Sequence, residues 1–590
     1  MTKTAEGGGP PPATQNRSPE QYTKTIHQAY TKSLHTELFS RVHYQFLSDY
    51  LTYTSRHDLP TQGPGRRASA PPRTTTRTQE DRFTYVVVHT IANGIIERHD
   101  FERKLGLDEF WRFPEAEPGT HQIIFVRGSL SPAWVDLLGA KYKVDPEFFR
   151  RHLQYLSRSD YSDLPPLPSA STNMLFLPVT SLYTRSPALN QDQVRRQRKE
   201  DDDVARSNHQ AIGQKASCGE SVVRKVSTLS DRLLSVEHDI SIYIRERKNG
   251  SRFAIVLLDN GLNLNRADGP PCFSRPDSKV RNPTANEISL NPILLPRPDM
   301  VHIDVDHPQV PEHDRGHANH LNSFCHVVSL IPFYFGMSWS QRNLSLMPHL
   351  ETTVLLKEVF KLVASAECQF LNRVHSEVRE QQRHSDDERQ MELVLNTLAY
   401  IKTLLDEHKP RLQQTIAFLS CRGITGSDTV PTVRAPCAAA TSQSIQQEEL
   451  GSIYADFEEL LSRNKGLGDF CVQSMDLIMN TAMLKESQKA VERADDQKRL
   501  TILAYFFLPL TLVSSIFGMN VKELGTGSQH IWLPVVILVP VALLALVLSH
   551  PHYFKPFVDN LIKPSSRGIP TYQTQGATSL FSVSSVNGRL

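Results

Sequence analysis

The sequence has little cysteine, and no two of its cysteines form a C-x-x-C pair. Seven cysteines are scattered over 590 residues, at Cys218, Cys272, Cys325, Cys368, Cys421, Cys437 and Cys471. An odd and scattered set argues against a disulfide framework and against a zinc-ribbon site. We therefore expect free thiols in a reducing compartment.

The chain also has little net charge, and it lacks a signal peptide and the common enzyme motifs. Its 65 basic and 63 acidic side chains leave a formal charge of +2, so it has no concentrated positive field and no nucleic-acid partner is expected. Residues 1–7 contain no apolar segment, which argues against a cleavable signal peptide. There is no G-x-G-x-x-G, Walker loop or nucleophile elbow, so we predict a protein that is not an enzyme and has no cofactor.

Composition predicts an α+β fold, with a large cytosolic α/β domain, long stalk helices and two C-terminal transmembrane helices. Short apolar runs indicate strands, and long stretches with helical spacing indicate the stalk. The predicted regions are a disordered tail at 1–80, the α/β domain with polar insertions at 81–341, the helical stalk at 342–498, a transmembrane hairpin at 499–549 and a cytosolic tail at 550–590.

Individual elements follow from the same patterns. A helix is expected at Asp100–Leu107 and helical spacing continues over Ser131–Leu156, whereas 187–217 and 262–300 are expected to be polar surface insertions. Within the tail, Tyr30–Tyr53 is an amphipathic stretch that could form a helix. The predicted strands are Tyr85–Val88, Gln122–Val126, Asn173–Val179, Ile240–Arg245 and Phe253–Leu258, and the long helices are Leu350–Gln382, Glu388–Leu419 and a run from Gln446 that loosens near Gly466 and Gly468.

Two apolar stretches close to the C-terminus predict a membrane hairpin. Leu500–Met519 and Ile531–Ser549 contain no charged side chain, and each is roughly 28–30 Å long as a helix, enough to cross the hydrocarbon core. Lys498 and Arg499 precede the first stretch, and basic residues also follow the second. This bias predicts an integral membrane protein with both termini in the cytosol.

Two spans from one chain cannot enclose a hydrated pore. If the protein conducts ions, it must be an oligomer in which each subunit contributes one span to a central axis. Hydropathy alone leaves open a second function, in which the hairpin anchors a cytosolic signalling or scaffold domain and conducts nothing.

The end of the first span resembles that of the CorA magnesium transporter family. Gly518-Met519-Asn520 stands nine residues after Pro509-Leu510-Thr511, and a long helical region, a short loop and a second span surround this pair of motifs. The long polar insertions are similar to those of a fungal branch of the family. The resemblance implies a homopentamer in a plasma or vacuolar membrane, in contact with lipid, that transports divalent cations and chiefly magnesium.

The resemblance also implies which residues line the pore. Gly518, Met519, Asn520 and Thr511 would line the pore, Asn520 and Thr511 with polar side chains, and Leu508 would form an apolar constriction. Magnesium releases its water reluctantly, so neutral oxygens that bind its hydration shell suit a pore better than a carboxylate cage. Glu523 would add an acidic ring at the mouth, unless it is an ordinary solvated loop residue.

One part of the sequence departs from this family. Where the cytosolic domain of its members typically carries a Glu-Asp pair after a helix and turn, this chain has Arg150-Arg151, and it has Ala494 where an asparagine is common. Acidic residues of the cytosolic domain help the family sense magnesium. The first departure therefore puts that sensor in doubt here.

Histidines and aspartates crowd the segment from His302 to His326. His317 and His320 have a spacing suited to a transition metal. The alternatives are a polar loop with chance histidines, a metal-sensing loop, or a transporter for zinc or another transition metal. No H-E-x-x-H motif is present, which disfavours a hydrolytic site.

Overall fold

The computed structural model divides the chain into two units, Met1–Met479 and Asn480–Leu590, which we call the N-terminal and the C-terminal unit. Each is described by itself. The structure describes residues 18–33, 41–55, 83–103, 106–157, 163, 167, 171–215, 218–247, 249–261, 287–294, 327–336, 350–383, 388–424, 437–517, 530 and 532–549.

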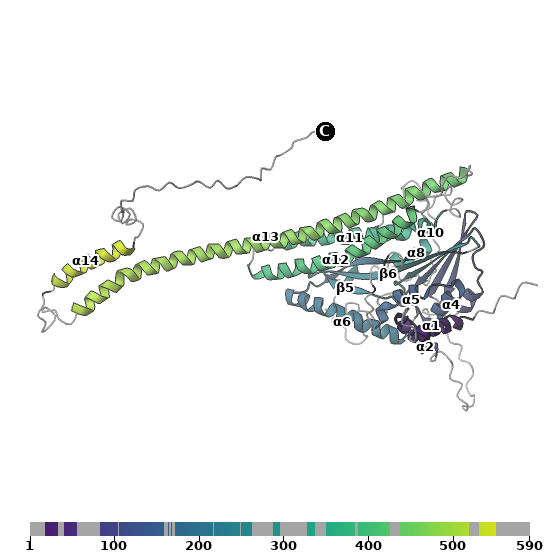
Figure 1. Ribbon diagram of the computed structural model, residues 1–590, viewed down its shortest axis with the longest axis horizontal. Coiled ribbons are helices and arrows are strands. Elements are labelled where there is room, and N and C mark those ends of the chain that lie inside the picture. Colours follow the sequence, from purple (N-terminus) through teal and green to yellow (C-terminus); the bar gives the residue numbers. More distant parts are fainter. Residues whose placement is uncertain are drawn as a thin grey trace, which may run out of the picture. The chain divides into compact units, whose positions relative to one another are not determined.

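A mixed eight-stranded sheet forms the centre of the N-terminal unit (Figure 1). Its order is β2-β1-β3-β7-β6-β4-β8, with β5 also paired to β6. β3 and β7 are parallel, and the other pairs are antiparallel. The strands are β1 (Thr84–Ala92), β2 (Ile95–Glu102), β3 (His121–Arg127), β4 (Met174–Ser186), β5 (Lys225–Thr228), β6 (Leu233–Glu246), β7 (Arg252–Leu258) and β8 (Glu287–Leu290).

The β1–β2 hairpin corrects the prediction of a helix at Asp100–Leu107. Asn93 and Gly94 form its two-residue turn, with positive φ angles of 51° and 77°, as the right-handed twist of a tight hairpin requires. β2 then runs antiparallel to β1, with Asp100 opposite Val87. Because pairing with β1 holds this segment extended, the helix α3 begins only at Gly106 and ends at Arg112.

Both faces of the sheet are apolar, and helices cover each of them (Figure 1). Side chains alternate between the faces, so that Val87 and Phe125 pack with one set of helices while Val86 and Ile124 pack with the other. Strands buried on two sides therefore appear as continuous apolar runs. The first set comprises α8 (Val327–Tyr334), α10 (Thr352–Leu355), α11 (Lys357–Arg383), α12 (Glu388–Ile424) and the part of α13 (Cys437–Phe517) in this unit; the second includes α4 (Pro132–Tyr142) and α5 (Pro146–His152).

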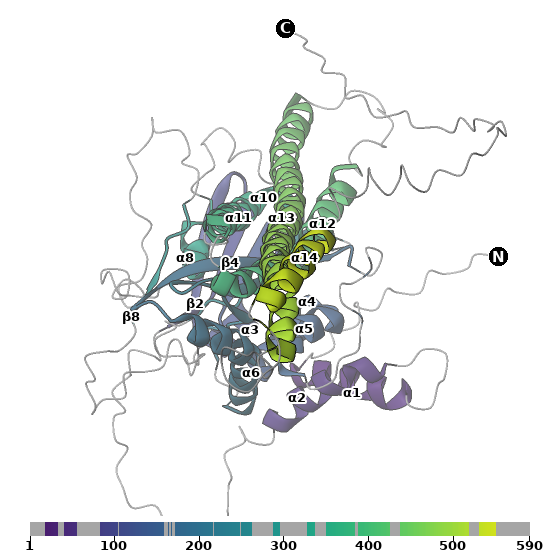
Figure 2. The same ribbon diagram turned by 90° about the vertical axis from the view of Figure 1, so that its left-hand side faces the viewer.

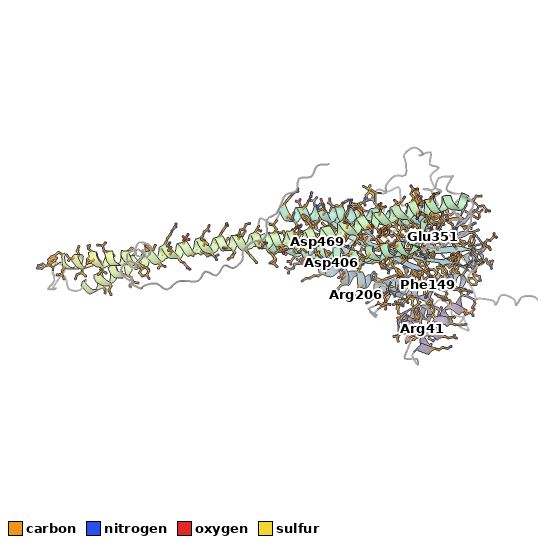
Figure 3. The ribbon with its side chains drawn as sticks, turned by 45° about the horizontal axis from the view of Figure 1, so that its top comes forward. Arg41, Phe149, Arg206, Glu351, Asp406 and Asp469 are labelled. Atoms are coloured by element: carbon orange, nitrogen blue, oxygen red, sulfur yellow. The ribbon has the colours of Figure 1, made fainter. Side chains whose placement is uncertain are left out.

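Two helices lie in the region expected to be a disordered tail. α1 (Glu20–Ser33) and α2 (Gln45–Ser55), with η1 (Val42–Tyr44) before α2, pack beside each other and against α4 (Figure 2). Their buried side chains, Ile26, Leu47 and Leu51, join the core that contains Phe149, labelled in Figure 3. The few apolar residues of this region thus lie on one face of each helix, and the fold supplies a partner for that face.

The polar insertion at 187–217 contains a long helix, α6 (Gln191–Lys215), which packs against β5 and the short helix η3 (Gln154–Leu156). Polar side chains make most of the attachment. Arg198 donates to the carbonyl oxygens of Thr228 and Leu229 at 2.9 and 2.7 Å. Asp201 accepts hydrogen bonds from the amide and hydroxyl groups of Thr228.

α11, α12 and α13 confirm the prediction of long helices after residue 342. α13 is a single helix of 81 residues, continuous through Gly466 and Gly468. Arg422, near the end of α12, donates to Glu351 at 3.1 Å. The C-terminal unit contains the remainder of α13 and a second helix, α14 (Trp532–Ser549).

Candidate functional site

The last part of α13 carries the two predicted pore residues that the structure describes. Leu508 and Thr511 are three residues apart, and Ala504 lies one turn before Leu508, so the three share one face of the helix. Ser515, which the sequence reasoning did not single out, continues that face one turn beyond Thr511. This part of α13 therefore presents a stripe of two apolar and two hydroxyl-bearing positions.

The Thr511 hydroxyl is held by its own helix. It lies 3.0 Å from the carbonyl oxygen of Phe507 and 2.9 Å from that of Leu508, and donates to them. A threonine bonded back in this way turns its oxygen lone pairs outward. The side chain can thus accept hydrogen bonds from water around the helix, as a ligand for a hydrated cation must.

Several apolar side chains of this stretch are exposed in the part of the chain that the structure describes. Leu508 is 69% exposed and Leu512 is 59% exposed. Leu503 and Tyr505 are exposed as well. Soluble monomers rarely leave so much contiguous apolar surface open, and such surfaces usually meet a membrane or another protein.

Among the residues that the structure describes, no helix is both long enough and apolar enough to cross a membrane.

Most of the other predicted site residues lie outside the described residues. They are Gly518, Met519, Asn520 and Glu523 of the first span and its loop, and His317 and His320 of the histidine-rich segment. In the part of the chain that is described, no group of three or more His, Cys, Asp and Glu side chains could hold a metal ion.

Arg150 and Arg151, where the resembled family carries an acidic pair, are part of a local ion-pair cluster. Arg150 donates to Glu147 at 2.7 Å and also contacts Asp163. Arg151 lies 2.6 Å from Glu147 and 3.2 Å from Asp163. Both guanidinium groups are therefore paired with carboxylates of their own domain, and the acidic pair is replaced by the opposite charge.

A buried charge network joins the sheet to α11 and α12. His408 of α12 lies 2.9 Å from Glu367 of α11 and 3.7 Å from Glu237 of β6. Arg411 donates to Glu237 at 2.6 Å. Burial opposes the charged imidazole, but Glu367 and Glu237 raise the pKa of His408 to about 9. Burial likewise opposes the Glu237 carboxylate, but Arg411 and His408 hold its pKa well below the usual range.

A second charge cluster lies where β5 and β7 meet along β6. Residues up to Glu237 pair with β5, and residues from Ile240 pair with β7. In the gap between these pairings, Arg224 donates to both oxygens of Asp259, at 2.6 and 2.8 Å. Asp239 lies 3.3 Å from the same guanidinium.

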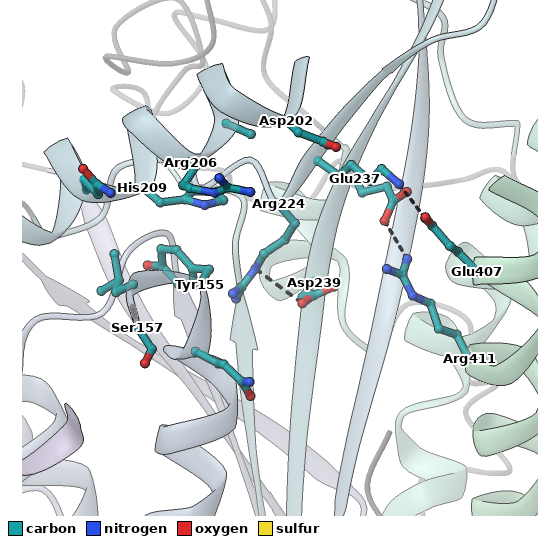
Figure 4. Close-up of a pocket in the computed structure, with 15 residues that line it drawn as sticks. Tyr155, Ser157, Asp202, Arg206, His209, Arg224, Glu237, Asp239, Glu407 and Arg411 are labelled. Atoms are coloured by element: carbon teal, nitrogen blue, oxygen red, sulfur yellow. Dashed lines mark hydrogen bonds and ion pairs between the residues drawn. The ribbon is translucent and has the colours of Figure 1, made fainter. Parts of the chain in front are cut away.

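A cavity of about 760 Å³ opens beside these two clusters, within the N-terminal unit (Figure 4). α6 supplies one wall, with Asp202, Arg206 and His209, and α12 supplies Glu407 and Arg411 on the other side. Sequence reasoning did not find this site, because its residues come from five separate segments.

Comparison with known proteins identifies the C-terminal region. No curated protein matches the chain. The solved structures that resemble it include the CorA magnesium transporter from Methanocaldococcus jannaschii, at 11% identity and a TM-score of 0.34 over 79% of this chain and 96% of that chain. The full-length CmaX protein has 12% identity and a TM-score of 0.24, over 79% and 97%.

These two similarities are too low to support an argument about function. The family comparison is more specific, since residues 430–550 match the model of the CorA-like Mg2+ transporter protein family. The matched segment contains all of α13 from Cys437, the Gly518-Met519-Asn520 motif and α14. The C-terminal region of this chain thus matches the CorA-like Mg2+ transporter family, which confirms the resemblance noted in its sequence.

Proposed function

We propose that this protein is a divalent-cation channel or transporter, chiefly for magnesium, that passes the hydrated ion through an oligomeric pore. The observation that carries the proposal is the family match over residues 430–550. In this proposal, Leu500–Met519 and Ile531–Ser549 cross a plasma or vacuolar membrane as a hairpin, and both termini lie in the cytosol. Several copies, five by the resemblance, surround the pore with the end of α13.

The chemistry of the α13 stripe supports this assignment. The Thr511 oxygen, with its hydrogen directed at the helix carbonyls, can accept hydrogen bonds from the water shell of a cation. Leu508, one turn earlier, would narrow the pore without binding the ion. The carbonyl end of each helix carries a partial negative charge, and several such ends at one mouth would attract cations.

The direction of ion movement follows from the orientation of the chain in the membrane. If the N-terminal unit lies in the cytosol, the end of α13 near Asn520 faces outward and meets the incoming ion first. A membrane potential that is negative inside then favours inward movement of a divalent cation. Asn520 would hold the water shell through a neutral oxygen, with Glu523 nearby to raise the local cation concentration.

Loss of the Asn520 side chain tests the pore directly. Cells that carry Asn520→Ala should lose at least 90% of the magnesium uptake that the protein supports, while protein level and oligomer size stay normal. Asn480→Ala is the matched control, because Asn480 is an exposed position of α13, and it should leave uptake unchanged. Unchanged uptake in Asn520→Ala would favour a non-conducting hairpin that anchors a signalling or scaffold domain.

The transition-metal alternative needs its own measurement. Flux into vesicles reconstituted with the protein should be compared for magnesium, cobalt, nickel and zinc. We expect magnesium to carry the largest flux. If zinc exceeds it, and His317→Ala with His320→Ala reverses that order, the protein is a zinc transporter with a sensing loop instead.

A further inference from the structure

The cavity near the junction of β5 and β7 lies among residues that the proposed transport of cations does not involve. Its lining belongs entirely to the N-terminal unit and combines polar groups from η3, α6, β5, β6 and α12 (Figure 4). Its volume of about 760 Å³ lies within the range of small-molecule sites.

Most charges in this lining are already balanced. Lys225 lies 2.5 Å from Glu407, and Arg411 lies 2.6 Å from Glu237. Each cation of these pairs faces a carboxylate at contact distance. An anionic ligand would have to break one of these ion pairs to bind here, and that disfavours a phosphate or carboxylate.

The Arg224 cluster carries one carboxylate in excess. Both carboxylate oxygens of Asp259 accept hydrogen bonds from the Arg224 guanidinium. One of them also accepts a hydrogen bond from the backbone N–H of Asp239 at 2.7 Å. Asp239 is left 3.3 Å from a nitrogen of Arg224 that already donates to Asp259. Among the described residues, no group donates a hydrogen bond to its carboxylate, whose side chain lines the cavity and is 30% exposed.

Two neighbours bear on how this carboxylate can be satisfied. Gln154 also lines the cavity, and its buried Oε1 atom has no hydrogen-bond donor among the described residues. Arg206 lies on the facing wall, but its guanidinium pairs with Asp203 at 3.8 Å on the surface of α6. Among the described residues, the lining therefore contains one half-buried carboxylate, whose nearest cation lies 3.3 Å away and already donates to Asp259, and one buried amide oxygen without a donor. Acceptors of this kind favour a ligand that brings N–H groups.

We propose that this cavity binds a small organic cation, with a guanidinium or primary ammonium group that donates to Asp239 and to the Gln154 amide oxygen. A metal ion fits less well, because the described residues offer no group of three metal-ligating side chains. A guanidinium or ammonium group needs only one carboxylate and neutral acceptors, and charge-assisted hydrogen bonds of this type are the strong ones.

Titration calorimetry on the full-length protein in detergent tests the site, with agmatine as the probe. Agmatine carries both a guanidinium and an ammonium group, and 1,4-butanediol is the uncharged control of similar length. We expect agmatine to bind and 1,4-butanediol not to bind. Asp239→Asn should weaken agmatine at least tenfold. Asp231→Asn, which alters a half-exposed carboxylate in the β5–β6 turn away from the cavity, should stay within twofold.

A second variant keeps the test decisive if Asp239→Asn does not fold. Gln154→Leu should weaken agmatine about tenfold to a hundredfold, since a single hydrogen bond to a charged group is lost. The proposal is overturned if the folded wild-type protein does not bind agmatine, if 1,4-butanediol binds equally, or if folded Asp239→Asn binds as the wild type does. Asn520→Ala should retain agmatine binding, so failure of the transport proposal and failure of this one are distinguishable.

Discussion

The sheet of the N-terminal unit and the end of α13 are both rich in apolar side chains, but they differ in what covers those side chains. Ile123 and Phe125 of β3 are fully buried, whereas Leu508 and Leu512 of α13 are more than half exposed. In the sheet, helices of the same chain supply the partner. At the end of α13 the described residues leave these side chains exposed, and the hydrophobic effect disfavours such exposure in water, so surfaces of this kind usually meet a membrane or another protein.

The comparison also separates two ways of using charge. The N-terminal unit buries carboxylates, a histidine and arginines as ion-paired clusters between strands and helices. The α13 stripe carries no charge between Leu500 and Phe517 and uses hydroxyl groups instead. Buried ion pairs hold one geometry, whereas neutral oxygens bind a hydrated ion weakly enough to release it.

The largest expected effect comes from removing a buried side chain of the sheet. Phe125→Ala removes a side chain that packs between His89 and Phe335 and should lower the free energy of unfolding of the N-terminal unit by about 3–5 kcal/mol. Phe507→Ala, at the exposed end of α13, should change it by less than about 0.5 kcal/mol. Urea denaturation followed by circular dichroism measures both, and equal losses would contradict the contrast drawn above.

The next effect is a dependence on pH. With its pKa raised to about 9, against about 6.5 in an unfolded chain, His408 stabilises the fold fully below about pH 6.5. This contribution, roughly 3 kcal/mol, is lost as the pH rises through 9. The groups that face the imidazole are Glu367, Glu237 and the Phe370 ring.

Unfolding free energies of the wild type and of His408→Gln, measured from pH 6 to pH 10, test this prediction. The wild type should lose stability with rising pH, and the difference between the two proteins should shrink over the same range. A difference that does not change with pH would mean that the imidazole is neutral and held only by hydrogen bonds.

The smallest effects are expected at two glycines, one with close neighbours and one without any within 4 Å. A Cβ atom at Gly139 of α4 would lie 2.3 Å from the Tyr22 ring of α1, so Gly139→Ala should cost about 1–3 kcal/mol by displacing α1. A Cβ atom at Gly466 of α13 meets nothing within 4 Å, and Gly466→Ala should stabilise by about 0.5–1 kcal/mol. Thermal unfolding and proteolysis of the α1–α2 segment measure the two, and equal signs would contradict the packing described here.

Much of the fold could be predicted where a local pattern was strong. Continuous apolar runs located β1, β3 and β7, and long helical spacing located α11 and α12. The hairpin at Asn93-Gly94 was missed, although Asn-Gly between two apolar runs is a strong signal for such a turn. Most of α2 lies within Tyr30–Tyr53, which was predicted as a possible helix, whereas most of α1 was missed because its few apolar residues are stable as a face only against α2 and α4.

The candidate functional residues also divide into those that a local pattern predicts and those that only tertiary packing brings together. Apolar composition, the Gly518-Met519-Asn520 motif and its spacing from Thr511 are properties of a contiguous segment, so the sequence by itself predicted the candidate pore and the resemblance to the CorA-like family, which the match over residues 430–550 supports. The charge network and the cavity were decided only by the tertiary structure. Glu237, Glu367 and His408 are far apart in the chain, and nothing local to any of them says which carboxylate will meet which cation. That choice depends on how strands and helices pack, because burial makes an unpaired charge too costly to leave without its partner.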